Sequence, residues 1–484
     1  MIIDIRPHAR LTGKDPVDLS TAVTPVVEAL SASASDLGRA RLVCDWVQYR
    51  DNFRDVVDLR PILSCAEPTV ADAFEVAVDM RRSGRVELRE LTSRRLREQP
   101  DDRVFLGPWG PGRDSCIWDF NALYWSALHL WEKATGHGYE QALPGGESDA
   151  RNRDAVRELI GDLFTAWDRL AECRALPEEL YVVELGVGNG NQARVFLDEF
   201  RDLDRSHGGR YYRRLHYLMC DYSQHVLDLS RENVAEHADR VSSVRLDATR
   251  PADSLGFLRF QVFLVYVSNV YDNLPTDEVA QIAGRSYAVQ TRAYLPPAEA
   301  DELAASISAD PHELPDLVRR LLRLGPALLV DAVPARFADV DAAVEFWRRT
   351  WSAVRLQERY APLGGLDLYP LAPSVSGEML RPLLESGADL RMHVNNGALT
   401  GFVDSLMLLH PFGKLVCHDL FVTDLSDYRT GFRGPGKYDG SVVNWVNGPL
   451  LAHVGRRKGF DVRYAPFQHH GGGHIVTMTA QVRE

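Results

Sequence analysis

Acidic residues end three of the predicted strands, and their types and positions could bind a ligand. Glu184 ends the first of these apolar runs, and Asp221 and Asp247 directly follow the next two. In an open α/β sheet, ligands bind outside the carboxyl ends of the strands. Three carboxylates at that edge suit a ligand with an ammonium group, a ribose diol and an exocyclic amine, because all of these groups donate hydrogen bonds.

A glycine-rich turn joins the first strand to a helix. Gly186, Gly188 and Gly190 permit positive φ and leave backbone N–H groups bare. A dinucleotide site has the pattern G-x-G-x-x-G/A, whereas here Asn191 stands where the third small residue should be. A nucleoside without phosphate fits better, and S-adenosylmethionine carries the required groups. The alternative is that the glycines form only a tight turn and the acids are helix N-caps.

This turn resembles the first motif of the class I S-adenosylmethionine-dependent methyltransferases. Residues 184–190 match its form, E/D-x-G-x-G-x-G. The resemblance covers residues 176–290 and 395–484. It implies an α/β fold with a Rossmann-like sheet of seven strands that ends in an antiparallel pair.

The resemblance also implies roles for the acidic residues. Glu184 and the glycine turn would hold the methionine part of the cofactor, Asp221 the ribose hydroxyls and Asp247 the adenine amine. The interval between Glu184 and Asp221 is longer than the family usually has, and the basic loop 205–214 supplies the excess.

Four polar residues follow the fourth apolar strand, at the edge where the methyl donor would lie. Burying such groups is costly unless they are used or satisfied. We expect Ser268 to contact the cofactor. We expect Asn269, Tyr271 and Asp272 to serve the reaction. The amino-methylating signature D/N-P-P-Y/F is absent, which argues against many DNA base methyltransferases.

The same segment is similar to the MidA family, which includes the arginine methyltransferase of respiratory complex I assembly. Asp272, Leu274 and Pro275 keep positions of that family's Asn-Glu-x-x-Asp-Ala-Leu-Pro stretch, and Asp419 is comparable to its acid after a long insertion. Asn269 stands where the family has glutamate, and the first 150 residues show no match. The similarity implies N-methylation of a guanidino group, of free arginine, an arginine-like small molecule or a protein arginine.

Methyl transfer is an in-line displacement that mainly requires alignment of the nucleophile. A carboxylate that pairs with a guanidinium can orient it and localise its charge. Asp272 and Asp419 suit this task, with Tyr271, His393 and His418 as secondary hydrogen-bond partners.

Alternative interpretations stay open for these residues. Asp272 could instead cap a helix over 276–282, and His418 could be a satisfied histidine at a strand end. O- or C-methylation of a natural product, with His418 or His393 as general base, is the alternative reaction. A binding or assembly protein that keeps the pocket without turnover is the alternative class.

Two loops carry further candidate groups. Residues 428–441 are rich in glycine and carry cations, which predicts either a mobile lid that meets a substrate carboxylate or a solvated surface loop. A lid would favour free arginine as the substrate. The His- and Gly-rich segment 468–474 lacks the spacing of a metal site, so we predict a connection between the last strands and no metal.

The remaining pattern predicts elements that position these residues. Amphipathic spacing predicts helices at 37–50, 69–82, 120–135 and 153–170, with an aromatic Gly/Pro loop at 105–120 that packs the N-terminal helices on the sheet or caps the site. An insertion of about 100 residues is too long for a loop. The predicted units are a mainly helical N-terminal domain (1–175), the first part of the core (176–290), a helical insertion on the substrate side (291–394) and the completion of the core (395–484).

Composition limits the class of protein. With 484 residues, of which 45% are hydrophobic, the chain can bury a large core. Its net charge of −13 disfavours nucleic acid or an anionic membrane as the main partner, so we expect a small molecule or a protein side chain. The six scattered cysteines and the lack of a signal-like segment predict a cytoplasmic protein. A homodimer is left open.

Overall fold

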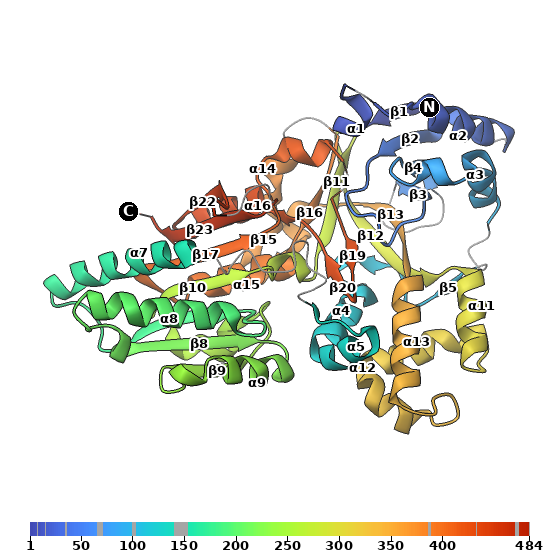
Figure 1. Ribbon diagram of the computed structural model, residues 1–484. Coiled ribbons are helices and arrows are strands. Elements are labelled where there is room, and N and C mark those ends of the chain that lie inside the picture. Colours follow the sequence, from blue (N-terminus) through green and yellow to red (C-terminus); the bar gives the residue numbers. More distant parts are fainter. Residues whose placement is uncertain are drawn as a thin grey trace.

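Two β-sheets organise the chain, and in the computed structural model they lie side by side (Figure 1). Apolar and β-branched residues form both sheets, because such side chains pack well on a pleated surface that is buried on at least one face. The structure describes all residues except 7, 15, 34–35, 65–70, 99–102, 140–152, 386–388, 432, 470–473 and 484.

The first sheet has seven strands in the order β22-β23-β17-β10-β7-β8-β9. Neighbouring strands are parallel except for β23, which is antiparallel to both β17 and β22. The inner strands are almost entirely buried, which is typical of a parallel sheet with helices on both faces. This is the strand order of the class I methyltransferase fold, so the predicted Rossmann-like sheet with its terminal antiparallel pair is confirmed.

We call this sheet and its helices the Rossmann-like unit. Its strands are β7 (Leu180–Leu185), β8 (Leu215–Asp221), β9 (Val241–Arg245), β10 (Val262–Ser268), β17 (Leu409–Asp419), β22 (Phe460–Pro466) and β23 (Val476–Val482). Its helices are α7 (Arg153–Glu172), α8 (Asn191–Ser206), α9 (Gln224–Asn233), α10 (Pro251–Leu255), α15 (Asn396–Leu406) and α16 (Gly448–Arg457).

The second sheet has ten strands in the described part of the chain and forms, with its helices, the second unit. Its strands are β1 (Ile2–Ile5), β2 (Ala40–Asp45), β3 (Val57–Leu63), β4 (Ala71–Asp79), β5 (Val104–Phe105), β6 (Gly110–Pro111), β11 (Asp277–Ile282), β12 (Arg285–Leu295), β13 (Arg355–Pro362) and β16 (Leu390–Val394). Its helices are α1 (Ala9–Thr12), α2 (Ser20–Ala32), α3 (Leu88–Arg97), α4 (Cys116–Ser126), α5 (Leu128–Thr135), α11 (Pro297–Ser306), α12 (Leu314–Ala332) and α13 (Val340–Ala353).

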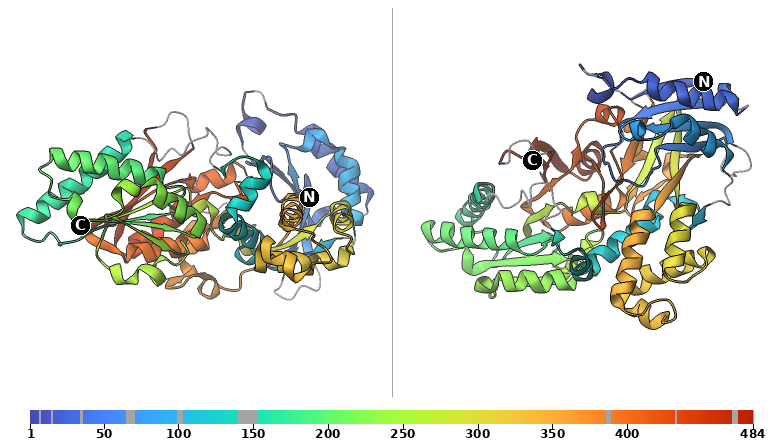
Figure 2. Two further views of the ribbon diagram at one scale, coloured as in Figure 1. Left: turned by 60° about the horizontal axis from the view of Figure 1, so that its bottom comes forward. Right: turned by 45° about the vertical axis from the view of Figure 1, so that its right-hand side comes forward.

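Helices α4 and α5 are the helices of the second unit that face the Rossmann-like unit. Figure 2 shows them in cyan between the green Rossmann-like strands and the yellow to orange helices α11, α12 and α13. Short elements complete the fold: α14 (Arg381–Leu384), β14 (Pro370–Ala372), β15 (Val375–Ser376), β18 (Phe421–Val422), β19 (Gly436–Tyr438), β20 (Ser441–Val443) and β21 (Val446–Asn447).

The prediction of a mainly helical N-terminal domain is wrong for its first 80 residues. The predicted helices at 37–50 and 69–82 contain β2 and β4, which pair in parallel. Residues 71–79 alternate small or acidic residues with apolar ones, a period of two that we read as helical spacing. The helices predicted at 120–135 and 153–170 correspond to α4, α5 and α7.

The prediction of a separate helical insertion at 291–394 also needs correction. Strands of this region pair with the N-terminal strands, as β13 does with β3, so both regions build one α/β unit. That unit resumes at β11, directly after the fourth strand of the Rossmann-like sheet. Residues 277–282 are therefore a strand, and Asp272 does not cap a helix there.

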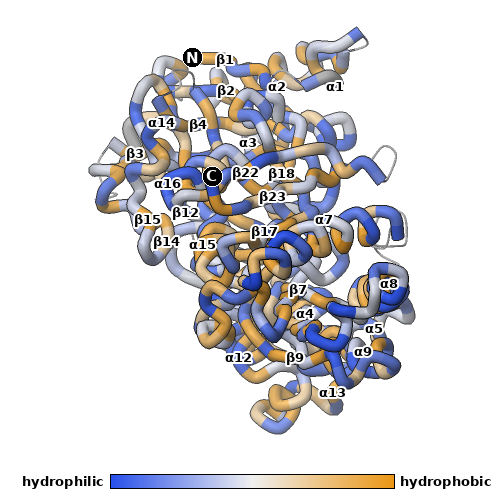
Figure 3. The backbone as a smooth tube through the Cα atoms, turned by 90° about the vertical axis from the view of Figure 1, so that its left-hand side faces the viewer, coloured by the Kyte–Doolittle hydropathy of each residue, from blue (hydrophilic) through white to orange (hydrophobic). Residues whose placement is uncertain are grey.

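Hydropathy follows the layers of the fold. Figure 3 shows hydrophilic and hydrophobic residues interspersed over this side of the molecule, and in α8 the apolar Phe196, Leu197 and Phe200 are buried against the sheet. Within the described residues, no helix is both long and apolar enough to cross a bilayer.

Candidate functional site

The glycine turn lies at the carboxyl end of β7, as predicted. Gly186, Gly188 and Gly190 all have positive φ, at +74°, +55° and +80°. A Cβ on Gly188 would lie 2.7 Å from the hydroxyl of Tyr139, so the protein's own packing already requires glycine there. The turn alone therefore does not decide between a ligand site and a tight connection.

Asp221 gives the turn its chemical character. Gly188 N–H donates to Asp221 Oδ2 at 3.2 Å, and Ser223 N–H donates to Oδ1 at 3.0 Å. Burial raises the pKa of Asp221 to about 6, so the carboxylate is ionised at neutral pH. The Asp221 carboxylate accepts the Gly188 N–H that a phosphate would need, and its negative charge repels a phosphate. A nucleoside without phosphate, whose hydroxyls donate to the carboxylate, fits this arrangement.

Glu184 lies beneath the turn rather than on its open side. The side chain is buried, and its carboxylate accepts a hydrogen bond of 2.7 Å from the hydroxyl of Tyr217 on β8. Burial raises the pKa of Glu184 to about 8, and the neighbouring Asp221 adds to that increase. At pH 7 this carboxyl is therefore protonated in the ligand-free protein. The contact of Glu184 with the methionine part of a cofactor stays a prediction.

The Glu184 carboxyl gives a testable dependence of stability on pH. The folded state keeps the proton up to a pKa of about 8, whereas the unfolded chain loses it near pH ~4.3. Stability therefore falls as pH rises between these values, by at most about 1.4 kcal/mol per pH unit. In Glu184→Gln, Tyr217 keeps an acceptor and this fall disappears, so the variant gains stability over the wild type as pH rises.

Urea unfolding at pH 5, 6, 7 and 8 measures the gain, with the exposed Glu179→Gln as control. A difference that is constant with pH would contradict it.

Two other predicted cofactor residues lie at the same edge. Asp247 follows β9, is exposed, and accepts the N–H of Thr249 at 2.8 Å. Ser268 ends β10, the strand that pairs with β7. Asn269 follows with a φ of +52°, a conformation that asparagine tolerates better than most residues, and donates its N–H to His418 O at 3.0 Å.

Aromatic residues from the end of α4 and beyond α5 approach the glycine turn, and sequence reasoning missed them. The hydroxyl of Tyr139 accepts the N–H of Asn189 at 3.3 Å, and the ring of Trp125 lies 5.7 Å from that of Tyr139. The imidazoles of His129 and His225 lie 5.1 Å apart. The aromatic content of this region was the available signal, but no local pattern shows which site it contacts.

Asp272 and Asp419, which were predicted to serve the acceptor, lie side by side but have unequal roles. Asp419 is fully buried, and its Oδ2 accepts the backbone N–H groups of Tyr271 at 2.8 Å, Val270 at 3.2 Å and Asp272 at 3.4 Å. Burial and the neighbouring Asp419 raise the pKa of Asp272, and burial raises that of Asp419 to about 6. Asp419 therefore fixes the turn after β10, and the pair retains a proton more readily than free carboxyls do.

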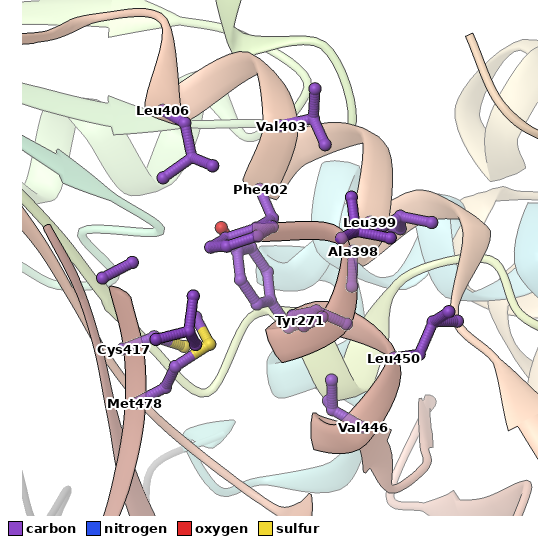
Figure 4. Close-up of a cluster of buried hydrophobic side chains, with 14 of the residues drawn as sticks. Tyr271, Ala398, Leu399, Phe402, Val403, Leu406, Cys417, Val446, Leu450 and Met478 are labelled. Carbon is purple, nitrogen blue, oxygen red and sulfur yellow. The ribbon is translucent and has the colours of Figure 1, made fainter. Parts of the chain in front are cut away.

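Tyr271 was predicted to serve the reaction, and the structure places it in the core instead. Figure 4 shows it among Phe402, Leu406, Cys417 and Met478, and its side chain is fully buried. The turn that Asp419 holds directs this ring inward, away from the edge of the sheet.

His418 is a satisfied histidine at a strand end. Its Nδ1 lies 2.9 Å from the hydroxyl of Thr477, and its ring packs edge-on against Tyr266 and Phe467. Burial lowers the pKa of His418 to about 4. The prediction of a general base has no support at this position, because the ring lies among side chains of its own sheet.

The loop 428–441 is neither a solvated loop nor a detached lid in its described part. Lys437 Nζ donates to the carbonyls of Trp351, Ser352 and Val354 at the end of α13, at 2.6 to 2.8 Å. Burial lowers the pKa of Lys437. We call residues 425–447 the cover segment, which lies between the two sheets with β19 and β20 (Figure 1). In the segment 468–474, residues 470–473 lie outside the described residues.

Sequence reasoning also missed a network of buried charges on the second sheet. Glu358 on β13 lies within 2.9 Å of guanidinium nitrogens of Arg54, Arg60 and Arg391. Arg60 also bonds to Glu75, and Arg391 to Glu278. The available signal was that Glu358 occupies the same face of β13 as Leu356 and Tyr360, since a charged group on a buried face must be paired.

We compared the chain with known sequences and with solved structures. No family description and no curated protein matches the sequence. A Burkholderia thailandensis structure solved with S-adenosyl-homocysteine bound is 13% identical with a TM-score of 0.46, covering 77% of this chain and 88% of that one. An uncharacterised protein of the same organism is 13% identical with a TM-score of 0.44, covering 77% and 87%. The DszA carbon methyltransferase is 12% identical with a TM-score of 0.33, covering 84% and 73%. The resemblance to the MidA family stays a prediction.

Proposed function

We propose that this chain is an S-adenosylmethionine-dependent methyltransferase that acts on a small molecule. The observation that carries the proposal is the Asp221 carboxylate, which accepts the Gly188 N–H at the carboxyl end of a sheet with the class I strand order. Dinucleotide sites present such N–H groups to a pyrophosphate, whereas here a carboxylate holds one of them.

The residues at this edge fit the cofactor by their chemistry. Asp221 would accept hydrogen bonds from the ribose hydroxyls, Asp247 would accept one from the adenine amine, and the glycine turn with Ser268 would border the methionine part. When bound, S-adenosylmethionine supplies an electrophilic methyl group. The chain's own task is then to hold the acceptor in line with that group and exclude water.

O- or C-methylation agrees best with the groups after β10. A guanidinium acceptor needs ionised carboxylates with free oxygens, but Asp419 already accepts three backbone N–H groups, and burial and the neighbouring Asp419 raise the pKa of Asp272. Methylation of a guanidino nitrogen is the second candidate, favoured by the presence of two carboxyls at this edge. An assembly protein without turnover is the third.

Binding of S-adenosylhomocysteine tests the cofactor assignment. We expect Asp221→Ala to weaken binding more than about tenfold, because a ribose diol would lose a charged acceptor. The matched control is Asp228→Ala, an exposed acid on the next helix that pairs with Arg231 and should bind normally. Calorimetric titration measures both. No binding by the wild type would overturn the proposal, and equal binding by the two variants would remove Asp221 from the site.

Turnover separates the candidate reactions. Incubation with methyl-labelled S-adenosylmethionine and a panel of carboxylic acids, phenols, arginine and arginine peptides identifies the acceptor class. Binding of the cofactor without transfer to any cellular small-molecule or protein fraction would favour the assembly protein.

A further inference from the structure

A polar recess lies between the charged face of the second sheet and the cover segment. It is small, with a volume of about 20 Å³, and five arginines contribute to its lining: Arg6, Arg54, Arg60, Arg391 and Arg433. His393 and Tyr428 complete one side, with their rings 5.5 Å apart. A space of this size holds about one water molecule, so it would take only the end of a ligand and not a whole substrate.

Most guanidiniums around the recess form ion pairs. Arg54, Arg60 and Arg391 pair with Glu358, Glu75 and Glu278. Arg6 lies 3.5 Å from Asp4. Asp45 also lines the recess, and Arg433 forms no ion pair among the described residues. Burial and the guanidiniums of Arg391, Arg433 and Arg54 lower the pKa of His393 to about 3, so this imidazole adds no charge.

Arg433 is held by an aromatic ring and by two long hydrogen bonds. Its Cζ lies 4.4 Å from the centre of the Trp445 ring, over the face of the indole. Its hydrogen bonds, to Asp427 O at 3.4 Å and Thr430 Oγ1 at 3.5 Å, are long. A guanidinium stacked on an aromatic ring presents its planar edge, which matches a carboxylate in a two-point contact.

Tyr49 packs on the cover segment at Gly436, where an added Cβ would lie 2.4 Å from the tyrosine ring. Burial and the nearby Asp272 raise the pKa of Tyr49 and Arg433 lowers it, so this side chain is near both the recess and the turn after β10. A molecule anchored at Arg433 would extend along Tyr49 toward Asp272.

We propose that this recess binds a carboxylate of the methyl acceptor, with Arg433 as its anchor, so that the enzyme selects acidic small molecules. Tyr428 is buried in the same recess and can donate its hydroxyl proton to the anion, since burial raises its pKa well above the usual value. The inference rests on the proposed methyltransferase function and adds the class of its acceptor.

Halide soaking tests the recess without knowledge of the acceptor. Crystals soaked in sodium bromide locate bound anions by anomalous scattering. We expect a bromide within hydrogen-bond distance of Arg433 in the wild type and none in Arg433→Gln. Thermal unfolding of both proteins, and of Arg319→Gln on the exposed face of α12, controls for folding. Bromide found only outside the recess, or retained in Arg433→Gln, would overturn the proposal.

Paired acceptors then test selection. Each carboxylic acid in the transfer panel is compared with its primary amide, and we expect turnover of acids only, with KM raised about tenfold or more in Arg433→Gln and partly restored in Arg433→Lys. Turnover of amides as efficiently as acids would contradict the inference while leaving the methyltransferase function intact. A protein that binds bromide in the recess but no S-adenosylhomocysteine would refute the proposed function instead.

Discussion

Replacement of Gly190 by alanine is expected to destabilise the Rossmann-like unit and to weaken binding of S-adenosylhomocysteine. Gly190 begins α8 with a φ of +80°, and an added Cβ would lie 2.8 Å from Cβ and 2.9 Å from Cα of Ser230 on α9. Backbone atoms of a packed helix cannot rotate away, so α8 and α9 must separate. The left-handed conformation costs about 1–2 kcal/mol, and overpacking adds about 1–3 kcal/mol.

A second glycine isolates the steric part of this effect. Gly209 has a similar φ of +66°, but an added Cβ there would meet nothing within 4 Å. Gly209→Ala should therefore lose only the ~1–2 kcal/mol of the backbone conformation and bind the nucleoside normally. Urea unfolding and calorimetric titration measure both variants. Equal losses of stability, or unimpaired nucleoside binding by Gly190→Ala, would show that the contact between α8 and α9 does not shape the turn.

The glycine turn was predictable because its signals are local. A short run of buried apolar residues, three closely spaced glycines and an amphipathic helix follow one another within 27 residues, from Leu180 to Ser206. The acids at the ends of β7 and β8 could be identified in the same way, since each lies at the end of an apolar run. The sequence does not show whether each of these side chains is exposed at the edge of the sheet, where it could contact a ligand. Glu184 turned beneath the sheet edge, where Tyr217 satisfies it.

The second unit was not predictable because its pairing is distant. Ile62 on β3 lies opposite Tyr360 on β13, almost 300 residues further along the chain. No local pattern reveals that partner, and strands such as 71–79, which contain alanine and glutamate, resemble amphipathic helices when read alone. The recess was not predictable for the same reason. Arg433 and Arg54 are far apart in the sequence, and only the fold brings them together.

Substitution of Glu358 by glutamine is expected to be among the most destabilising single changes in the second unit. Its two carboxylate oxygens face three buried guanidiniums, those of Arg54, Arg60 and Arg391. Glutamine keeps the shape but removes the one negative charge that all three guanidiniums share. Breaking a buried ion pair in this way costs about 3–5 kcal/mol. Because the cover segment lies on this face, we also expect the recess to lose its order.

The dependence on pH distinguishes an electrostatic loss from a packing defect. Burial alone would raise the pKa of Glu358, but the guanidiniums of Arg391, Arg54 and Arg60 hold it well below its usual value. The stability that this carboxylate contributes is therefore present above pH ~4.3, where the unfolded chain is also ionised, and is lost as the pH falls below that value. Unfolding free energies of the wild type and Glu358→Gln should converge in acid and differ fully at pH 7. The exposed Glu345→Gln, which removes a surface pair with Arg348, should change stability by less than about 0.5 kcal/mol at every pH. A loss in Glu358→Gln that is the same at pH 7 and in acid well below pH ~4.3 would mean that shape, and not charge, holds the three arginines in place.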